Sequence, residues 1–386
     1  MEISLSRYRW TILGAGVVAQ AAFSALLLGL ASITPAIQDR YGLTLAQVGV
    51  VLAAVSIGLV VTMLPWGILA DRIGERTTIA LGLSGCGAAT AGAGFAGSYG
   101  ALVVLLAVAG AFGGCVQSAS GRAVMSWFGP AERGLALGIR QTAVPLGGAI
   151  AAVVLPALAS GPGLRSAFLA LAAGSWLGAA VGLGLLRDAP AGELEAELAR
   201  PLRDRRLWLL CGGSTLYLAG QFAVLGFVVL FLPQHRGFSN GTAAGVLAAV
   251  QVLGGAARIG AGRWSDRVQE RIVPLRWIGA TLAVALAVSA ALVDASTWLL
   301  VPALLLAGTL GLSWNGLSYT AAAERAGAAR SGAAIGIQQT ALAVGSIVFP
   351  IAFAAVVGAA SWRLGFLLIA LCPLAGFVAL RPLAER

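Results

Sequence analysis

The sequence predicts an all-α membrane protein in which twelve transmembrane helices form two pseudo-symmetric six-helix bundles. Hydrophobic residues make up 59% of the 386 residues and charged residues only 10%, whereas a soluble domain carries roughly a quarter charged residues. The apolar residues fall into runs of about 20, the length that a helix needs to cross some 30 Å of hydrocarbon. Motifs of the first half recur in the second half.

Six apolar runs precede a polar segment and six follow it. The first bundle is expected over residues 1–186, with helices near 10–35, 45–69, 77–97, 100–126, 133–158 and 163–186. A polar loop is expected over 187–206. The second bundle is expected over 207–386, with helices near 207–232, 242–262, 275–293, 297–321, 331–357 and 361–381. The 53 glycines suit helices that pack closely in a membrane.

The turn between the second and third runs reads Gly67-Ile-Leu-Ala-Asp71-Arg72-Ile-Gly74-Glu75-Arg76. A glycine at position 67 lets two helix backbones approach, the aspartate can cap a helix or form an ion pair, and Gly74 permits a left-handed turn. The same skeleton returns 195 residues later as Gly262-Arg263-Trp264-Ser265-Asp266-Arg267, with Gln269 in place of the turn glycine. We expect a gate built from Gly67, Asp71, Arg72, Gly74, Arg76, Arg133, Gly262, Asp266 and Arg267.

A second repeat joins the fifth and eleventh runs. Gly138-Ile-Arg140-Gln141-Thr-Ala143 matches Gly336-Ile-Gln338-Gln339-Thr340-Ala341, and Arg165 with Phe168 matches Arg363 with Phe366, all 198 residues apart. With the turn motif and its echo, this six-plus-six pattern resembles the major facilitator superfamily of secondary transporters over essentially the whole chain. Such halves place a solute site near the midplane at their interface, and rocking between them gives alternating access.

Charge predicts how the chain lies in the membrane. The net charge is +10 and every basic residue is arginine, mostly in short loops. If both termini are cytoplasmic, only Arg40, Arg165, Arg236 and Arg363 fall outside. We therefore expect a multi-pass protein of the plasma (inner) membrane with cytoplasmic termini and a cytoplasmic central loop. The basic excess indicates contact with the lipid bilayer, not with nucleic acid.

Signatures of metal and enzyme chemistry are missing. The cysteines Cys86, Cys115, Cys211 and Cys372 lie in apolar runs without a C-x-x-C pattern, and His235 is the only histidine. There is no P-loop, no nucleophile elbow and no H-E-x-x-H motif. We expect no enzyme activity, no cofactor, no metal and no cleavable signal peptide, and a functional monomer that uses a solute gradient.

Three arginines lie inside predicted spans, whereas no Asp or Glu lies in the middle of one: Arg122, Arg140 and Arg258. An arginine at the bilayer centre costs at least about 2.5–3.5 kcal/mol, so each needs a partner. The candidates are backbone carbonyls, Gln and Asn side chains, lipid phosphate and an anionic solute. A proton relay through intramembrane carboxylates is disfavoured unless the two motif aspartates take part.

Depth and the repeat separate these arginines. Arg258 precedes Asp266 by eight residues, about 12 Å along a helix, and Arg140 lies roughly 10 Å inside its helix end. Arg122 is close enough to Trp127 to snorkel to the interface, which favours a structural role. Their repeat counterparts are Met63, Gln338 and Thr320. An arginine without a twin indicates specialisation, so Arg258 is favoured for solute contact, while both roles stay open for Arg140.

The segment Arg258-Ile-Gly-Ala-Gly262-Arg-Trp-Ser-Asp266 is also similar to the eighth span of monocarboxylate transporters and oxalate:formate antiporters. In those families an arginine at this spacing binds the substrate carboxylate, and the resemblance implies that role for Arg258 alone. Gly254 stands where the monocarboxylate transporters keep an aspartate, and their first-span lysine has no equivalent. Gln338 and Gln339 lie where the oxalate antiporters keep a basic residue.

The function predicted is a secondary active or facilitative transporter of a small organic anion, a carboxylate. Alternatives are an exporter of small hydrophobic or antimicrobial compounds, and a transport-like membrane sensor. Exporter signatures are weak, because Leu106 replaces the arginine of the fourth-span pattern and Val144–Gly148 only approximates that of the fifth. The candidate solute-binding residues are Arg258, Arg140, Gln20, Gln117, Tyr217, Gln221, Gln251, Asn315, Gln338 and Gln339.

Overall fold

The computed structural model describes residues 2–187, 201–327 and 330–384. By contacts the chain divides into two compact units: unit 1 is Met1–Gly129, Ile139–Pro201 and Ala326–Thr340, and unit 2 is Pro130–Gly138, Leu202–Arg325 and Ala341–Arg386. These units differ from the predicted bundles 1–186 and 207–386, because the first part of the fifth span joins unit 2 and that of the eleventh joins unit 1. Most of the predicted loop over 187–206 lies outside the described residues.

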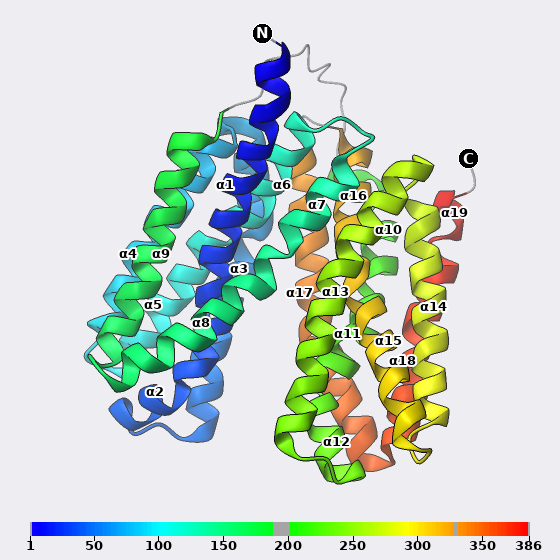
Figure 1. Cartoon of the computed structure of the whole chain (residues 1–386). Coiled ribbons are helices and arrows are strands. Elements are labelled where there is room, and N and C mark those ends of the chain that lie inside the picture. Colours follow the sequence, from blue (N-terminus) through cyan, green and yellow to red (C-terminus); the bar gives the residue numbers. More distant parts are fainter. Residues whose placement is uncertain (1, 188–200, 328–329, 385–386) are drawn as a thin grey trace. The chain divides into compact units, whose positions relative to one another are not determined.

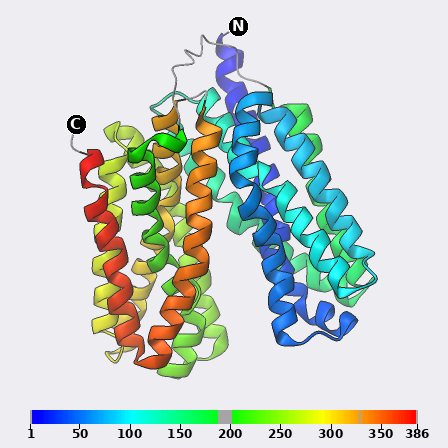
Figure 2. The same ribbon diagram turned by 180° about the vertical axis from the view of Figure 1, so that it is seen from behind.

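Unit 1 is a bundle of long helices (Figures 1 and 2). Its elements are α1 (Glu2–Gly29), η1 (Leu30–Ile33), α2 (Thr34–Tyr41), α3 (Leu45–Ile73), α4 (Glu75–Gly94), α5 (Tyr99–Gly113), α6 (Cys115–Trp127), the end of α7 (Arg133–Gln141), α8 (Ala143–Ser160), α9 (Leu164–Leu185) and the start of α17 (Ser331–Ala359).

Unit 2 is a second bundle of the same kind (Figure 1). It holds the start of α7, η2 (Pro201–Arg203, whose first residue falls in unit 1), α10 (Arg205–Thr215), α11 (Tyr217–Leu225), α12 (Val228–Arg236), α13 (Asn240–Val268), α14 (Ile272–Ala291), α15 (Thr297–Ser313), α16 (Asn315–Ala326), the rest of α17, α18 (Trp362–Ala379) and α19 (Arg381–Ala384).

The helices are long and apolar enough for a membrane protein. Eleven segments of the described chain qualify by length and composition as membrane spans. The remaining predicted span is α4, which has 20 residues but is rich in glycine, alanine and threonine and so less apolar. The twelve-helix fold of two bundles is consistent with this arrangement.

Several predicted spans are broken near their middle. The fourth span divides at Gly114 into α5 and α6, the fifth at Thr142 into α7 and α8, and the tenth at Trp314 into α15 and α16. Both motif helices also run further than predicted, since α3 continues to Ile73 and α13 to Val268. The motif aspartates therefore lie in last helical turns and not in loops.

Packing repeats between the units. In unit 1, α4 packs on α9 and α3 on α5, and in unit 2 the equivalent helices α14 and α18, and α13 and α15, pack on each other. Glycine makes the closest of these approaches possible. A Cβ on Gly58 of α3 would lie 1.9 Å from the carbonyl oxygen of Ala107, and one on Gly110 of α5 would lie 2.0 Å from that of Val55, so the two backbones touch.

Candidate functional site: motif clamps and buried arginines

In unit 1, Asp71 holds the first turn of α17. Its carboxylate accepts hydrogen bonds from the backbone N–H groups of Gly332, at 3.0 Å, and Ala333, at 2.9 Å. These groups lack helical partners at a helix start, and the helix dipole favours a negative charge there. A Cβ on Gly67 would lie 2.4 Å from the carbonyl oxygen of Gly332. The glycine and the aspartate of the motif thus form one clamp on α17.

Unit 2 repeats the clamp on α7. The carboxylate of Asp266 accepts from the N–H groups of Gly134, at 2.9 Å, and Leu135, at 2.7 Å. A Cβ on Gly262 would lie 2.2 Å from the carbonyl oxygen of Gly134. The two sequence repeats, 195 and 198 residues apart, therefore meet in space, since each motif aspartate caps the helix that carries the second repeat. Arg133 begins α7.

The turns after the two motifs each contain a residue with positive φ. Gly74 has φ +82° and Gln269 has φ +53°, and Gln269 is the non-glycine residue with positive φ among the described residues. The two turns still differ, because ψ is 162° at Gly74 and 30° at Gln269. Gln269 is held by hydrogen bonds to Asp266, because its backbone N–H and its side-chain amide both donate to the carbonyl oxygen of that residue.

The motif arginines have separate places. Arg76 donates from Nε to the carbonyl oxygen of Leu183 at 2.8 Å, which ties the start of α4 to the end of α9. Arg72 and Arg267 are exposed. They can therefore be reached from solvent without disturbing the clamps.

Arg122 of α6, for which a structural role is predicted, lies beside two carboxylates of unit 1. Its guanidinium forms an ion pair with Glu75, and its Nε lies 3.4 Å from Oδ1 of Asp71. The side chain of Glu75 is 0% exposed and that of Arg122 is 13% exposed. A buried carboxylate keeps its charge only when a partner compensates the lost hydration. Arg122 is that partner, and it also faces the clamp of unit 1.

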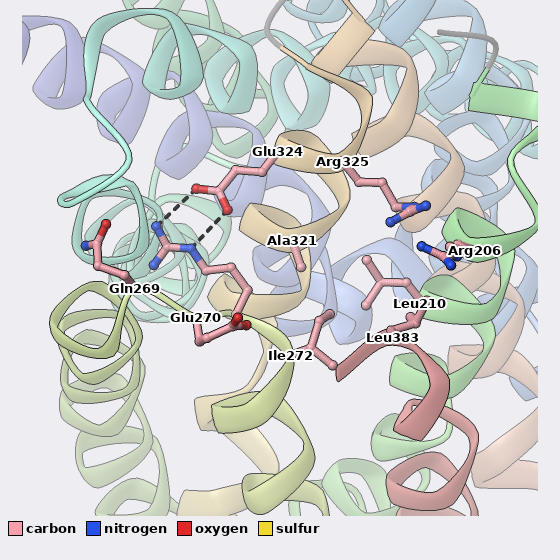
Figure 3. Close-up of a pocket in the computed structure, with 10 residues that line it drawn as sticks. Arg206, Leu210, Gln269, Glu270, Ile272, Ala321, Glu324, Arg325 and Leu383 are labelled. Carbon is pink, nitrogen blue, oxygen red and sulfur yellow. Dashed lines mark hydrogen bonds and ion pairs between the residues drawn. The ribbon is translucent and has the colours of Figure 1, made fainter. Parts of the chain in front are cut away.

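Unit 2 builds the corresponding cluster with the charges exchanged. Arg271, just before α14, lies 2.6 Å from Asp266, and it donates to both oxygens of Glu324 on α16 at 3.0 Å each, drawn as dashed lines in Figure 3. Burial alone would lower the pKa of Arg271, but Glu324 and Asp266 raise it above its ordinary value. In unit 1 the arginine, Arg122, comes from the fourth span and the second acid, Glu75, comes from the turn. In unit 2 the arginine, Arg271, comes from the turn and the second acid, Glu324, comes from the tenth span.

A cavity of about 570 Å3 adjoins this cluster (Figure 3). Arg206 and Arg325 lie on its far side from Glu324, with Leu210, Ile272 and Leu383 among the wall residues. Arg325 is paired with Asp204 at 2.7 Å. The cavity is therefore a mixed-charge recess beside the clamp, not a cationic site.

Arg140 is the centre of a polar cluster in unit 1. It is 0% exposed and donates to Ser120 Oγ at 2.8 Å, Gln20 Oε1 at 3.2 Å, Gln141 Oε1 at 3.2 Å and the carbonyl oxygen of Gln117 at 3.4 Å. These acceptors are uncharged. The structure thus brings together three predicted site residues, Gln20, Gln117 and Arg140. Sequence reasoning missed Ser120 and Gln141, although Gln141 lies next to Arg140 in the repeated segment.

Arg258 is buried in the middle of α13, in unit 2. It is 7% exposed, and its Nε donates to the carbonyl oxygen of Leu312 at 2.7 Å. Leu312 lies in the last turn of α15, two residues before the break at Trp314. This bond fixes the plane of the guanidinium and uses one of its five N–H donors. On the other side of α13, a Cβ on Gly138 would lie 2.8 Å from the carbonyl oxygen of Arg258.

Three other predicted residues of unit 2 lie around the same break: Tyr217, Gln221 and Asn315. Asn315 donates to Gln221 Oε1 at 3.2 Å. Tyr217 stacks edge-on against Trp314 at 5.7 Å between centroids, and its ring fills notches at Gly279 and Gly376. Among the described residues, neither the Tyr217 hydroxyl nor the Trp314 Nε1–H has a hydrogen-bond partner. Gln251 is half-buried in α13 of unit 2. Gln338 and Gln339 are buried in the part of α17 that belongs to unit 1.

Comparison with known proteins identifies relatives along the whole chain. The family model described as Major Facilitator Superfamily matches residues 12–350. An uncharacterized MFS-type transporter of Mycobacterium tuberculosis is 35% identical over 373 residues, which cover 95% of this chain and 83% of the relative.

Two further proteins extend the comparison. A probable sulfoacetate transporter of Cupriavidus necator is 31% identical over 275 residues, 66% of this chain and 64% of the relative. The crystal structure of the human organic anion transporter MFSD10 matches with a TM-score of 0.78 at 17% identity, over 96% of this chain and 99% of that one. At that identity the likeness shows the fold alone.

Proposed function

The chain belongs to the major facilitator superfamily and is a multi-pass membrane transporter, and on that premise we propose that it carries a small organic anion, a carboxylate. Transport would be by alternating access as uniport, exchange or co-transport. The observation that carries this proposal is Arg258, a guanidinium 7% exposed within an apolar span. Holding a cation there costs free energy, and a bidentate carboxylate is the ligand that the planar guanidinium fits best.

Two further findings support an anionic solute. The position of Arg258, eight residues before the motif aspartate, resembles the carboxylate-binding position of the monocarboxylate transporters. The relative from Cupriavidus necator is named for sulfoacetate, a small carboxylate. We assign Arg140, with Gln20 and Gln117, as a second polar group that contacts solute, and Gln221, Gln251, Asn315, Gln338 and Gln339 as neutral contacts.

The test is anion-dependent stability. Purified protein is melted in the presence of sulfoacetate and a panel of small carboxylates, each compared with its neutral amide. A ligand that binds the folded state raises the melting temperature by mass action. We expect the carboxylate and not the amide to do so. Stabilisation by apolar drugs alone would favour the exporter, and stabilisation without flux would favour the sensor.

We propose that both clamps lie at the cytoplasmic surface of the plasma membrane and that the termini lie on the same side. Arg72 and Arg267 are exposed, whereas Glu75 is buried, so Arg72→Cys and Arg267→Cys report sidedness best. The variants are made in a Cys372→Ser background, because the other native cysteines are buried. An impermeant maleimide should label the introduced cysteines at positions 72 and 267 only in permeabilised cells. Trp298→Cys, at a side chain 88% exposed, should react in intact cells. Free labelling of position 72 or 267 in intact cells would show that the topology is the reverse of the one proposed.

We propose that the two clamps gate transport. A variant at Asp71 tests this proposal more sharply than one at Asp266. Asp71→Asn removes the charge that the helix start favours and one acceptor, worth about 1–2 kcal/mol. That corresponds to roughly a 5- to 30-fold change in the balance between clamped and released states. Uptake into proteoliposomes should therefore slow while the melting temperature stays close to that of the parent. Asp39→Asn, the same change at an exposed acid, is the control. Parental turnover in Asp71→Asn would leave Asp71 without a gating role.

A further inference from the structure

At the end of unit 1 remote from its clamp, the ends of three connections line an open cavity of about 420 Å3. The wall comes from the end of α2 with Arg40 and Tyr41, from the α4–α5 turn with Phe95 and Ala96, and from the start of α9 with Arg165. None of the described residues that line it is acidic. The cavity is within the size range of small-molecule sites.

Two exposed arginines at this cavity lie near aromatic rings. The guanidinium carbon of Arg165 lies 3.7 Å from the ring centroid of Phe95, and that of Arg40 lies 5.8 Å from the ring of Tyr41. Tyr41 in turn donates its hydroxyl to the carbonyl oxygen of Ala96 at 2.8 Å. Within the described residues, neither arginine side chain forms an ion pair or a hydrogen bond. Stacking orients a guanidinium without consuming its N–H donors.

The internal repeat supplies the same place in unit 2 for comparison. The helices α2 and α12 end alike, at Gly42 with φ +63° and Gly237 with φ +68°, which makes His235 the counterpart of Arg40. Arg363 is the counterpart of Arg165. The helices α5 and α15 follow Ser98 and Ser296. Two residues before these serines, unit 1 has Ala96 and unit 2 has Asp294.

In unit 2 the carboxylate of Asp294 bridges the side chains at these two positions. Its Oδ1 lies 2.9 Å from Nε2 of His235, and its Oδ2 accepts from Nη2 of Arg363 at 2.8 Å. The hydrogen bond with His235, and then the charge of Arg363, lower the pKa of Asp294 below its usual range, so it is carried as a carboxylate. Unit 2 therefore fills this place with an anionic group of its own.

We propose that the cavity of unit 1 binds the carboxylate or phosphate group of a separate ligand between Arg40 and Arg165, where unit 2 uses Asp294. The same chemistry is offered by the phosphate of an anionic phospholipid headgroup and by a small soluble anion. Arginine is suited to both, because its fork donates two parallel hydrogen bonds to either group. The proposal does not depend on the identity of the transported solute.

The experiment melts the full-length protein in nanodiscs under two sets of conditions. In phosphatidylcholine discs, inorganic phosphate is titrated at constant ionic strength. In a second arm, phosphatidylglycerol replaces part of the phosphatidylcholine and no phosphate is added. A rise in melting temperature with phosphate identifies a soluble anion as a source, and a rise with phosphatidylglycerol alone identifies the headgroup. Either rise supports the site only if the variants below remove it.

Two variants test the residues, with one matched control. Arg165→Gln should raise the ligand concentration that gives half of the melting-temperature shift by roughly 10- to 100-fold, the range for a charge-assisted contact. Ala96→Asp places a carboxylate where unit 2 has Asp294. This variant should melt no lower than the parent, and neither ligand should raise its melting temperature. Arg363→Gln makes the same charge change in unit 2 and should retain the ligand effect. The proposal is overturned if neither ligand stabilises the parent, or if Ala96→Asp responds as the parent does.

Discussion

Replacing Arg258 by glutamine is expected to weaken binding of a small carboxylate by roughly 30- to 1,000-fold while the protein stays folded. A buried anion left without its cation loses about 2–4 kcal/mol of binding free energy, and glutamine offers two N–H donors without charge. The Leu312 carbonyl needs only one of them, so the packing of α13 against α15 should survive. The measurement is the concentration of carboxylate that half-saturates the shift in melting temperature.

Two companion variants make the Arg258 result interpretable. Arg258→Lys keeps the charge but lacks the planar fork, so it should lose most of the affinity. Arg263→Gln removes an exposed arginine five residues further along the same helix and should bind as the parent does. If Arg258→Gln binds and carries the solute like the parent, the carboxylate proposal fails and the exporter becomes the better reading.

Replacing Arg122 by glutamine is expected to have the largest effect on stability, about 3–5 kcal/mol. The reason lies in Glu75, whose side chain is 0% exposed and forms an ion pair with Arg122. Without the guanidinium, a carboxylate remains buried beside Asp71, a second carboxylate that lies 3.4 Å from the same arginine. The free energy of unfolding is measured by titrating the purified protein with a denaturing detergent.

The double variant Arg122→Gln with Glu75→Gln separates this ion pair from other effects of the arginine. Once Glu75 is neutralised, most of the lost stability should return, because Asp71 keeps its two backbone N–H donors and no second carboxylate is left buried without a partner. The affinity for carboxylate should change little in either variant, in contrast to Arg258→Gln. Equal destabilisation of the single and double variants would show that the ion pair contributes nothing specific.

The fold could be predicted because membrane helices and repeats leave strong signals in sequence. Runs of apolar residues marked the spans, and the motifs at Asp71 and Asp266 marked the two halves. The helix breaks at Gly114 and Trp314 were not predicted, because hydropathy reports the environment of a span and not its backbone hydrogen bonds. Gln269 adopts the positive φ expected of a glycine, held by bonds that a sequence pattern does not reveal.

The partners of the buried charges were less predictable. The sequence places Glu75 in the turn between two spans, and only the three-dimensional packing of α4 on α6 shows that it lies against Arg122. The exchange of charges in unit 2, with Arg271 in the turn and Glu324 on α16, hides the correspondence from a residue-by-residue comparison. For Arg140 the acceptors Ser120 and Gln20 come from other helices, 20 and 120 residues away in sequence. Polar partners must be found in space.

Uptake into proteoliposomes tests the central claim, anion transport through Arg258, most directly. Vesicles that contain the parent protein and no ATP should accumulate a radiolabelled small carboxylate, with sulfoacetate tried first, in a saturable manner down its imposed gradient. The neutral amide should not enter, and Arg258→Gln vesicles should take up the carboxylate no faster than protein-free vesicles. Equal uptake by the parent and Arg258→Gln, or binding of the carboxylate without any uptake, would contradict the account.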